Sequence, residues 1–119
     1  HTMSVQNDPL YSTGGDLGGV MEQSDSPVRV EVATVASSHQ ASIGKGTATA
    51  GTATLTGRPA GMDGFEAVLD ADGVAIVYDA AGSDAQVTYT DIDGRMIEFK
   101  WTLSGGNGTF LYNFSGVNR

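Results

Sequence analysis

Aromatic side chains that combine an apolar ring with a polar tip are the groups in this sequence best suited to binding chemistry. A tyrosine or tryptophan needs a hydrogen-bond partner for its O–H or N–H group when the ring is buried. If the strands that carry these residues curl around a common centre, their rings line a cavity for an apolar small molecule. A packed core is the simpler explanation, because every small β-sheet core needs alternating large side chains. The candidate ligand-binding residues are Tyr78, Tyr89, Trp101 and Tyr112.

Two Asp-x-Asp-Gly stretches, at 70–73 and 91–94, place carboxylates close together. Calcium is bound by clustered carboxylate and carbonyl oxygens, and an EF-hand loop begins with this spacing. Such a loop also needs a glutamate at its last position and helices on both sides, whereas Glu98 follows too early and both flanks are typical of strands. Asp-Gly instead supplies the positive φ angles of tight hairpin turns. We therefore expect turns here and no metal site.

Side chains suited to acid–base catalysis are few. His39 lies in a polar stretch between predicted strands, where we expect a surface residue, and no Gly-x-Ser-x-Gly turn is present to position a serine nucleophile. Glu98 shares a strand face with Lys100, which predicts either a solvated face or a cross-strand ion pair. The absence of cysteine excludes a thiolate zinc site and a cysteine nucleophile. The sequence therefore predicts no catalytic residue and no cofactor.

The elements that must position these residues are predicted to be β-strands. Strands joined by short loops run antiparallel, so residues 63–116 predict an up-and-down meander of about five strands, and residues 28–57 about two more. About seven or eight strands must close or stack to hide their edges. We expect an all-β fold in which the meander closes into a barrel of about 7–8 strands, with a two-sheet β-sandwich as the alternative. The alternation of apolar and polar residues that indicates these strands is clearest at 28–33, 65–69, 74–78, 87–91, 95–104 and 110–115.

Threonine alternates with small residues from 47 to 56. β-branched side chains favour extended backbone, so this segment is also expected to be a strand. Its small polar side chains indicate a solvent-facing strand at the edge of a sheet.

The first 27 residues lack this alternation. Residues 1–3 are typical of a cloning remnant, and glycine pairs with low hydrophobicity favour a flexible arm. Apolar residues such as Leu17, Val20 and Met21 leave open that the arm docks on a sheet or on a neighbouring subunit. The predicted organisation is a flexible or docking N-terminal arm at 1–27 and a single β domain at 28–119.

Composition limits the partners. The 119 residues include 14 Asp and Glu against 6 Lys and Arg, which gives a net charge of −8. Nucleic acids and anionic membrane surfaces are polyanions, so this charge argues against both. No apolar run reaches the roughly 20 residues of a membrane helix, so we expect no membrane insertion. A chain without cysteine and rich in Gly, Ser and Thr favours a secreted or extracytoplasmic protein.

These observations favour a non-catalytic binding or assembly module, of bacterial or phage origin, that engages a protein partner or itself. The alternative is a small-molecule β-barrel that holds an apolar ligand among its aromatic side chains. Such a barrel could be a carrier, or a cyclase or isomerase, because holding a substrate in a reactive conformation needs few charged groups. A carbohydrate-binding module would need exposed aromatic rings, and we expect Trp101 to be buried.

Overall fold

The computed structural model describes residues 16–32 and 37–117, and its regular elements are almost entirely β-strands. One short 3-10 helix, η2, lies between the first two strands. The prediction of an all-β fold is confirmed. The elements are β1 (Asp16–Met21), η2 (Gln23–Asp25), β2 (Val28–Glu31), β3 (Ser38–Lys45), β4 (Thr52–Pro59), β5 (Glu66–Ala67), β6 (Val77–Asp79), β7 (Gln86–Asp93), β8 (Met96–Ser104) and β9 (Phe110–Val117).

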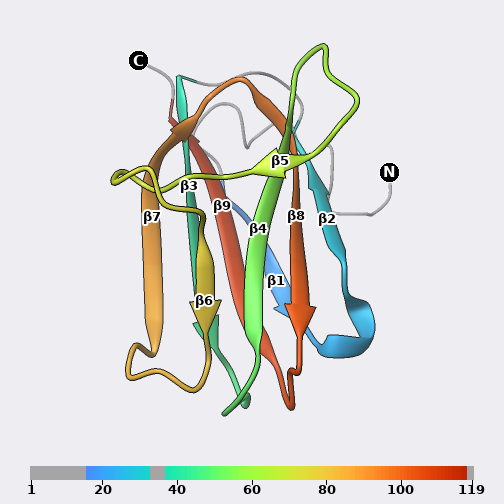
Figure 1. The fold of residues 1–119 in the computed structure, drawn as a ribbon, viewed down its shortest axis with the longest axis vertical. Helices are drawn as coiled ribbons and strands as arrows, with labels where there is room; N and C mark the ends of the chain where they lie inside the picture. The colour runs from blue at the N-terminus through green and yellow to red at the C-terminus, as the bar shows by residue number, and fades with distance from the viewer. Residues whose placement is uncertain (1–15, 33–36, 118–119) are drawn as a thin grey trace.

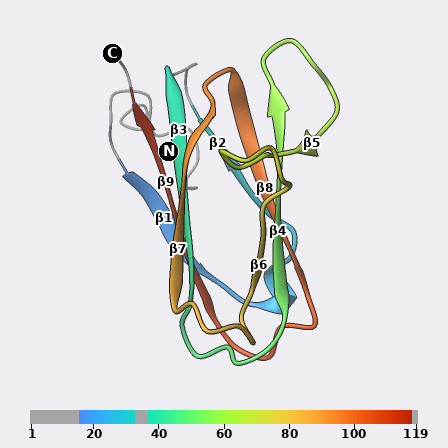
Figure 2. The same cartoon turned by 60° about the vertical axis from the view of Figure 1, so that its left-hand side comes forward.

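The strands form two antiparallel sheets (Figure 1). Sheet A has the order β1-β9-β3-β7, and sheet B has the order β2-β8-β4-β5, with β6 also paired to β4. Figure 2 shows the two sheets as separate layers, and no strand pairing among the described residues closes them into a single barrel. Large apolar side chains from both layers fill the space between them.

The predicted meander is wrong in its pairing, because consecutive strands mostly belong to different sheets. β7 and β8 are separated only by Gly94 and Arg95, yet β7 pairs with β3 and β8 pairs with β2 and β4. A short connection fixes the antiparallel direction of two strands without requiring them to be neighbours in one sheet. The apolar faces of β8 and β9 meet across the core instead, where the Phe99 and Phe114 rings stack with their centroids 4.8 Å apart.

The threonine-rich segment forms β4, which is not an edge strand as predicted. β4 pairs with β8 on one side and with β5 and β6 on the other. Ala53, Leu55 and Gly57 face the core, while the threonines between them are half-buried on the outer face of sheet B. Small residues facing inward leave room for the aromatic rings of β8 and β9, so the alternation reflects packing inside a sheet.

The segment for which an arm was expected is described from Asp16 onward. Residues 16–21 form β1, which pairs with β9 along its whole length and buries Leu17 and Met21 in the core. Gly18 is required by this pairing, because a Cβ there would lie 2.5 Å from the Tyr112 carbonyl oxygen. The first 15 residues lie outside the described part of the chain.

The two Asp-x-Asp-Gly stretches form different structures. Asp70 Oδ1 accepts hydrogen bonds from the amides of Asp72 (2.8 Å) and Val74 (3.0 Å), and Gly73 has φ +79°, as the turn interpretation predicts. In the second stretch the left-handed residue is Asp91, with φ +59°, rather than Gly94. The pairing of β3 with β7 shifts register at this point, so Asp91 lies in a β-bulge.

Candidate functional site

Tyr78, the first of the predicted ligand-binding residues, is buried and already has hydrogen-bond partners. Its hydroxyl donates to the carbonyl oxygens of Asp84 (2.8 Å) and Ala85 (3.3 Å), in the loop that leads to β7. Its ring packs edge-on against Phe110. Burial raises the pKa of the Tyr78 phenol above its usual value of 10. In this position the side chain fastens a loop to the core.

Trp101 is completely buried on β8, as expected. Its ring centroid lies 6.3 Å from that of Phe114, and its Nε1 has no hydrogen-bond partner among the described residues. Tyr112 is half-buried and also contacts Phe114, with 6.2 Å between ring centroids, and burial raises the pKa of the Tyr112 phenol. Tyr89 is half-buried on β7, and burial raises its pKa as well. The structure therefore brings Trp101 and Tyr112 together around Phe114, within the packed core.

Tyr112 also lines a shallow hollow of about 120 Å³ on the outer side of sheet A. Tyr78, Tyr89 and Trp101 line neither this hollow nor the larger one described below. The hollow lies over Gly44, whose missing side chain leaves a depression between Leu111 and Gln86. It is smaller than the several hundred cubic ångströms of a typical small-molecule pocket.

The outer face of sheet A around this hollow is uncharged. We call it the uncharged face and define it by the outward positions nearest the hollow; Asp16 and Asp93 hold outward positions at the far ends of β1 and β7 and are not part of it. Val20 and Leu111 are opposite each other on β1 and β9, and both are exposed apolar residues. The Ser42 hydroxyl lies 2.9 Å from that of Thr88 on the neighbouring strand. The face consists of Gly18, Val20, Gln40, Ser42, Gly44, Gln86, Thr88, Leu111 and Asn113.

The edges of the two sheets differ in how far they are protected against pairing with another chain. Natural edge strands are protected by shortness, charge, proline or a bulge. β7 carries the bulge at Asp91, β2 has four residues that include Arg29 and Glu31, and β5 and β6 have two and three residues. β1 carries one charged residue, Asp16 at its first position, and has none of these features from residue 17 to residue 21. Its side away from β9 has no strand partner among the described residues.

Charged side chains instead cluster on the outer face of sheet B, around Glu98. This carboxylate is only 1% exposed and accepts hydrogen bonds from Arg29 Nε (2.7 Å) and Arg58 Nε (3.0 Å). Arg29 and Lys100 both lie over the ring of Phe65, with Lys100 Nζ 4.4 Å from its centroid. Of the two interpretations of Glu98, the structure shows the ion pair, although the carboxylate is buried. Both ion-pair partners are distant in sequence, so the spacing of residues gave no signal for this burial.

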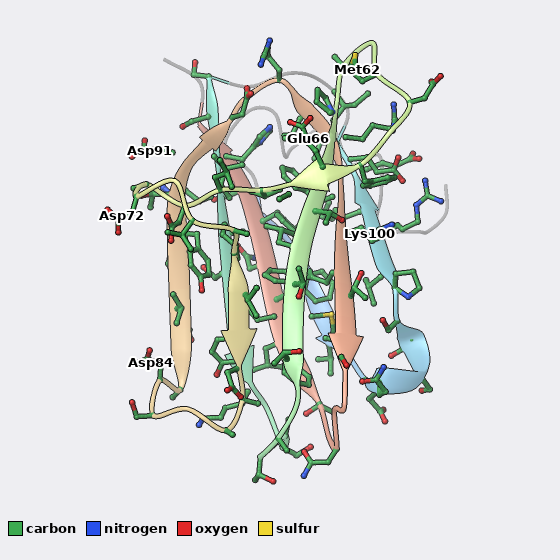
Figure 3. All side chains as sticks on the ribbon, viewed as in Figure 1. Met62, Glu66, Asp72, Asp84, Asp91 and Lys100 are labelled. Carbon is green, nitrogen blue, oxygen red and sulfur yellow. The ribbon has the colours of Figure 1, made fainter. Side chains whose placement is uncertain are left out.

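A larger hollow, of about 300 Å³, lies between β5 and the end of β7 and is bordered by acidic side chains. Figure 3 shows Asp72 and Asp91 close to this end of β7, well separated from Lys100 on β8. The Asp93 carboxylate accepts hydrogen bonds from Arg95, which lower the Asp93 pKa. Among the residues described, no group of three or more His, Asp or Glu is arranged to hold a metal ion. The acidic residues that line this hollow are Glu66, Asp70, Asp91 and Asp93.

His39 is not a surface residue, as its polar neighbours suggested. It lies on β3 with its side chain between the sheets, and no part of it is exposed. Its Nε2 donates a hydrogen bond to the Met96 carbonyl oxygen (3.0 Å), and its ring packs edge-on against Phe99. Burial lowers the pKa of the His39 imidazole below 6.5. This effect is larger than the opposing effects of hydrogen bonds and of the nearby Asp93 carboxylate, which raise the pKa.

Comparisons with protein-family models, with curated proteins and with solved structures found no match to this chain. In the part of the chain that the structure describes, no helix is long and apolar enough to span a membrane. Among the described residues, the feature that distinguishes this surface is the edge of sheet A at β1, which has no strand partner there and lies beside the uncharged face.

Proposed function

We propose that this chain is a non-catalytic binding or assembly module that takes an extended segment of a protein partner against β1. The architecture we propose is a two-sheet β-sandwich instead of a closed barrel. Its support is the assignment of consecutive strands to opposite sheets, with large side chains packed between the layers. An extracytoplasmic role in a bacterium or phage, expected from composition, remains part of the proposal.

The observation that carries the proposal is the contrast between β1 and the other edges. A strand with an unpaired side presents a row of N–H and C=O groups that an extended segment can pair with. Main-chain hydrogen bonds supply affinity in this mode of recognition, and side chains on alternate positions supply specificity. At β1 the exposed pair Val20 and Leu111 offers an apolar contact to a side chain of the added strand.

Selection from a random peptide library tests the proposal and does not require the natural partner. Peptides that bind the full chain are selected, and their site is mapped by amide chemical shifts and hydrogen exchange. We expect the amide signals of residues 17–21 to shift, and the alternate amides whose N–H groups point away from β9 to gain protection from exchange, because they acquire hydrogen-bond partners. Peptides that instead perturb the outer face of sheet B or the acidic hollow would contradict the proposal.

The second candidate is a small-molecule carrier or a cyclase or isomerase, and one observation favours it. Trp101 Nε1 is a buried donor with no partner in the described part of the chain, and a buried polar group of this kind calls for an explanation such as a bound molecule. The Tyr112 hollow of about 120 Å³ would hold only a small part of such a molecule. Native mass spectrometry separates the candidates, since a retained ligand appears as a defined excess mass that is lost on denaturation.

A further inference from the structure

We infer that the strand which pairs with β1 is the β1 of a second copy of this chain, in an antiparallel register centred on Gly19. The pairing would join two copies of sheet A into one continuous sheet across a twofold axis. This inference rests on the proposed function, because it names the partner of the same edge.

Symmetry restricts the register. Residues directly opposite each other in an antiparallel pair point to the same face of the sheet. The hydrophobic cores of both copies lie on the same side of the joined sheet only if the twofold axis passes through a residue of β1. An axis between two residues would place the two cores on opposite sides of the sheet. Centring on Gly19 pairs Leu17 with Met21 of the second copy, and Gly18 with Val20 of the second copy.

The side chains of β1 suit this register. Val20 is 61% exposed and projects from the outer face, where the opposite residue of the second copy would be Gly18, which has no side chain. Leu17 and Met21 face the core side, so apolar residues meet there as well. A register centred on Gly18 would instead place Val20 opposite Asp16. The sequence of β1 thus favours the register in which every paired residue from 17 to 21 is uncharged.

Charge restricts where two copies can meet. Each chain carries a net charge of −8, so two copies repel each other through most of their surfaces. In the register centred on Gly19, residues 17–21 oppose only uncharged residues, and acidic residues oppose each other only at the two ends, where Asp16 lies opposite Glu22 of the second copy. The β7 edge carries two aspartates, and the bulge at Asp91 interrupts its regular pairing. β1 is therefore the edge better suited to self-pairing.

Sedimentation velocity of the full chain over a range of concentrations, in low and high salt, tests the inference. We expect a monomer–dimer equilibrium that shifts toward dimer as salt screens the net charge. Val20→Lys places an ammonium group opposite the backbone of the second copy and should raise the dissociation constant about tenfold or more. Val77→Lys is the matched control, because Val77 is 50% exposed on the edge strand β6 and the change in net charge is the same. That variant should dimerise like the parent.

Three outcomes would overturn the inference. A chain that stays monomeric at all concentrations, while selected peptides still bind to β1, would retain the proposed function and exclude self-pairing. Equal effects of Val20→Lys and Val77→Lys would place the dimer contact elsewhere. A dimer that forms only after residues 1–15 are removed would show that this segment of the chain, and not a second copy, occupies the edge. Peptides that avoid β1 would instead count against the proposed function itself.

Discussion

Sheet B carries on its outer face a buried carboxylate, two arginines that pair with it and a lysine over an aromatic ring. Around the hollow over Gly44, sheet A carries glycine, uncharged polar side chains and one exposed apolar pair on the corresponding face. Both sheets nonetheless bury the same kind of apolar residue toward the common core. The difference therefore lies in what each outer face is suited to do.

Glu98 accepts hydrogen bonds from both Arg29 and Arg58, so these three charged groups on the outer face of sheet B are already paired. They also connect strands: Arg29 is on β2, Glu98 on β8 and Arg58 on β4. The uncharged face of sheet A has no comparable connection between its described strands. We interpret the charged face as a support for sheet B and the uncharged face, with its open edge, as the surface available to a partner.

The largest effect that sharpens this contrast is expected from Glu98→Ala. Removing a buried carboxylate leaves two arginines without their partner, and the free energy of unfolding should fall by about 3 kcal/mol, the low end for a broken buried pair because the arginines can reach water. Urea unfolding monitored by Trp101 fluorescence measures this change. Glu31→Ala is the control, since Glu31 is exposed on the adjacent strand and should change stability by no more than about 0.5 kcal/mol. Equal losses for the two variants would contradict the role given to Glu98.

An effect of intermediate size, on how the free energy of unfolding changes with pH, is expected from His39 on the inner side of sheet A. Because burial lowers the pKa of His39, the unfolded chain takes up a proton at a higher pH than the folded protein does. The free energy of unfolding should therefore be constant above the unfolded pKa of about 6.5 and should decrease as the pH falls below it. Urea midpoints at pH 7.5, 6.5 and 5.5 test this, with His39→Gln expected to flatten the curve. A parent chain equally stable at all three values would disprove the prediction.

The smallest effect is expected from Ser42→Ala on the uncharged face. This change removes the hydroxyl pair with Thr88, which is exposed to water, and cross-strand pairs of this kind contribute only a few tenths of a kcal/mol. The free energy of unfolding should fall by about 0.5 kcal/mol or less. Thr88→Ala should match it, and the double variant should lose little more than either single one. A loss comparable to that of Glu98→Ala would mean that the two outer faces contribute equally to stability.

Local alternation was sufficient to predict the strands and the fold class. Phe99, Trp101 and Leu103 face the core as predicted for the strand at 95–104. Ile97 was predicted to share that face but is only half-buried, while Met96 is buried. The cause is a bulge in β8: the consecutive residues Arg58 and Pro59 of β4 pair with Glu98 and Met96, which leaves Ile97 as an extra residue. A period of two along the chain cannot reveal such an extra residue.

Pairing and burial of polar groups could not be predicted, because they depend on residues far apart in the chain. Glu98 alternates like a surface residue, and its burial depends on Arg29 and Arg58, which come from other strands. His39 has polar neighbours along the chain, but its ring meets Phe99 from the opposite sheet. β1 is short and rich in glycine, so its pattern gave no strand signal before β9 was known to be its neighbour. These features determine where the candidate site lies.

The pairing of the first described strand with the last has a consequence for synthesis on the ribosome. β1 leaves the ribosome early, whereas its partner β9 is made about ninety residues later, a delay of roughly 5–20 seconds at ordinary elongation rates. Until then Leu17 and Met21 lack the strand against which they pack in the finished protein. β1 is therefore exposed to chaperones, to proteases and to neighbouring nascent chains until β9 has been made, and sheet A is completed only then.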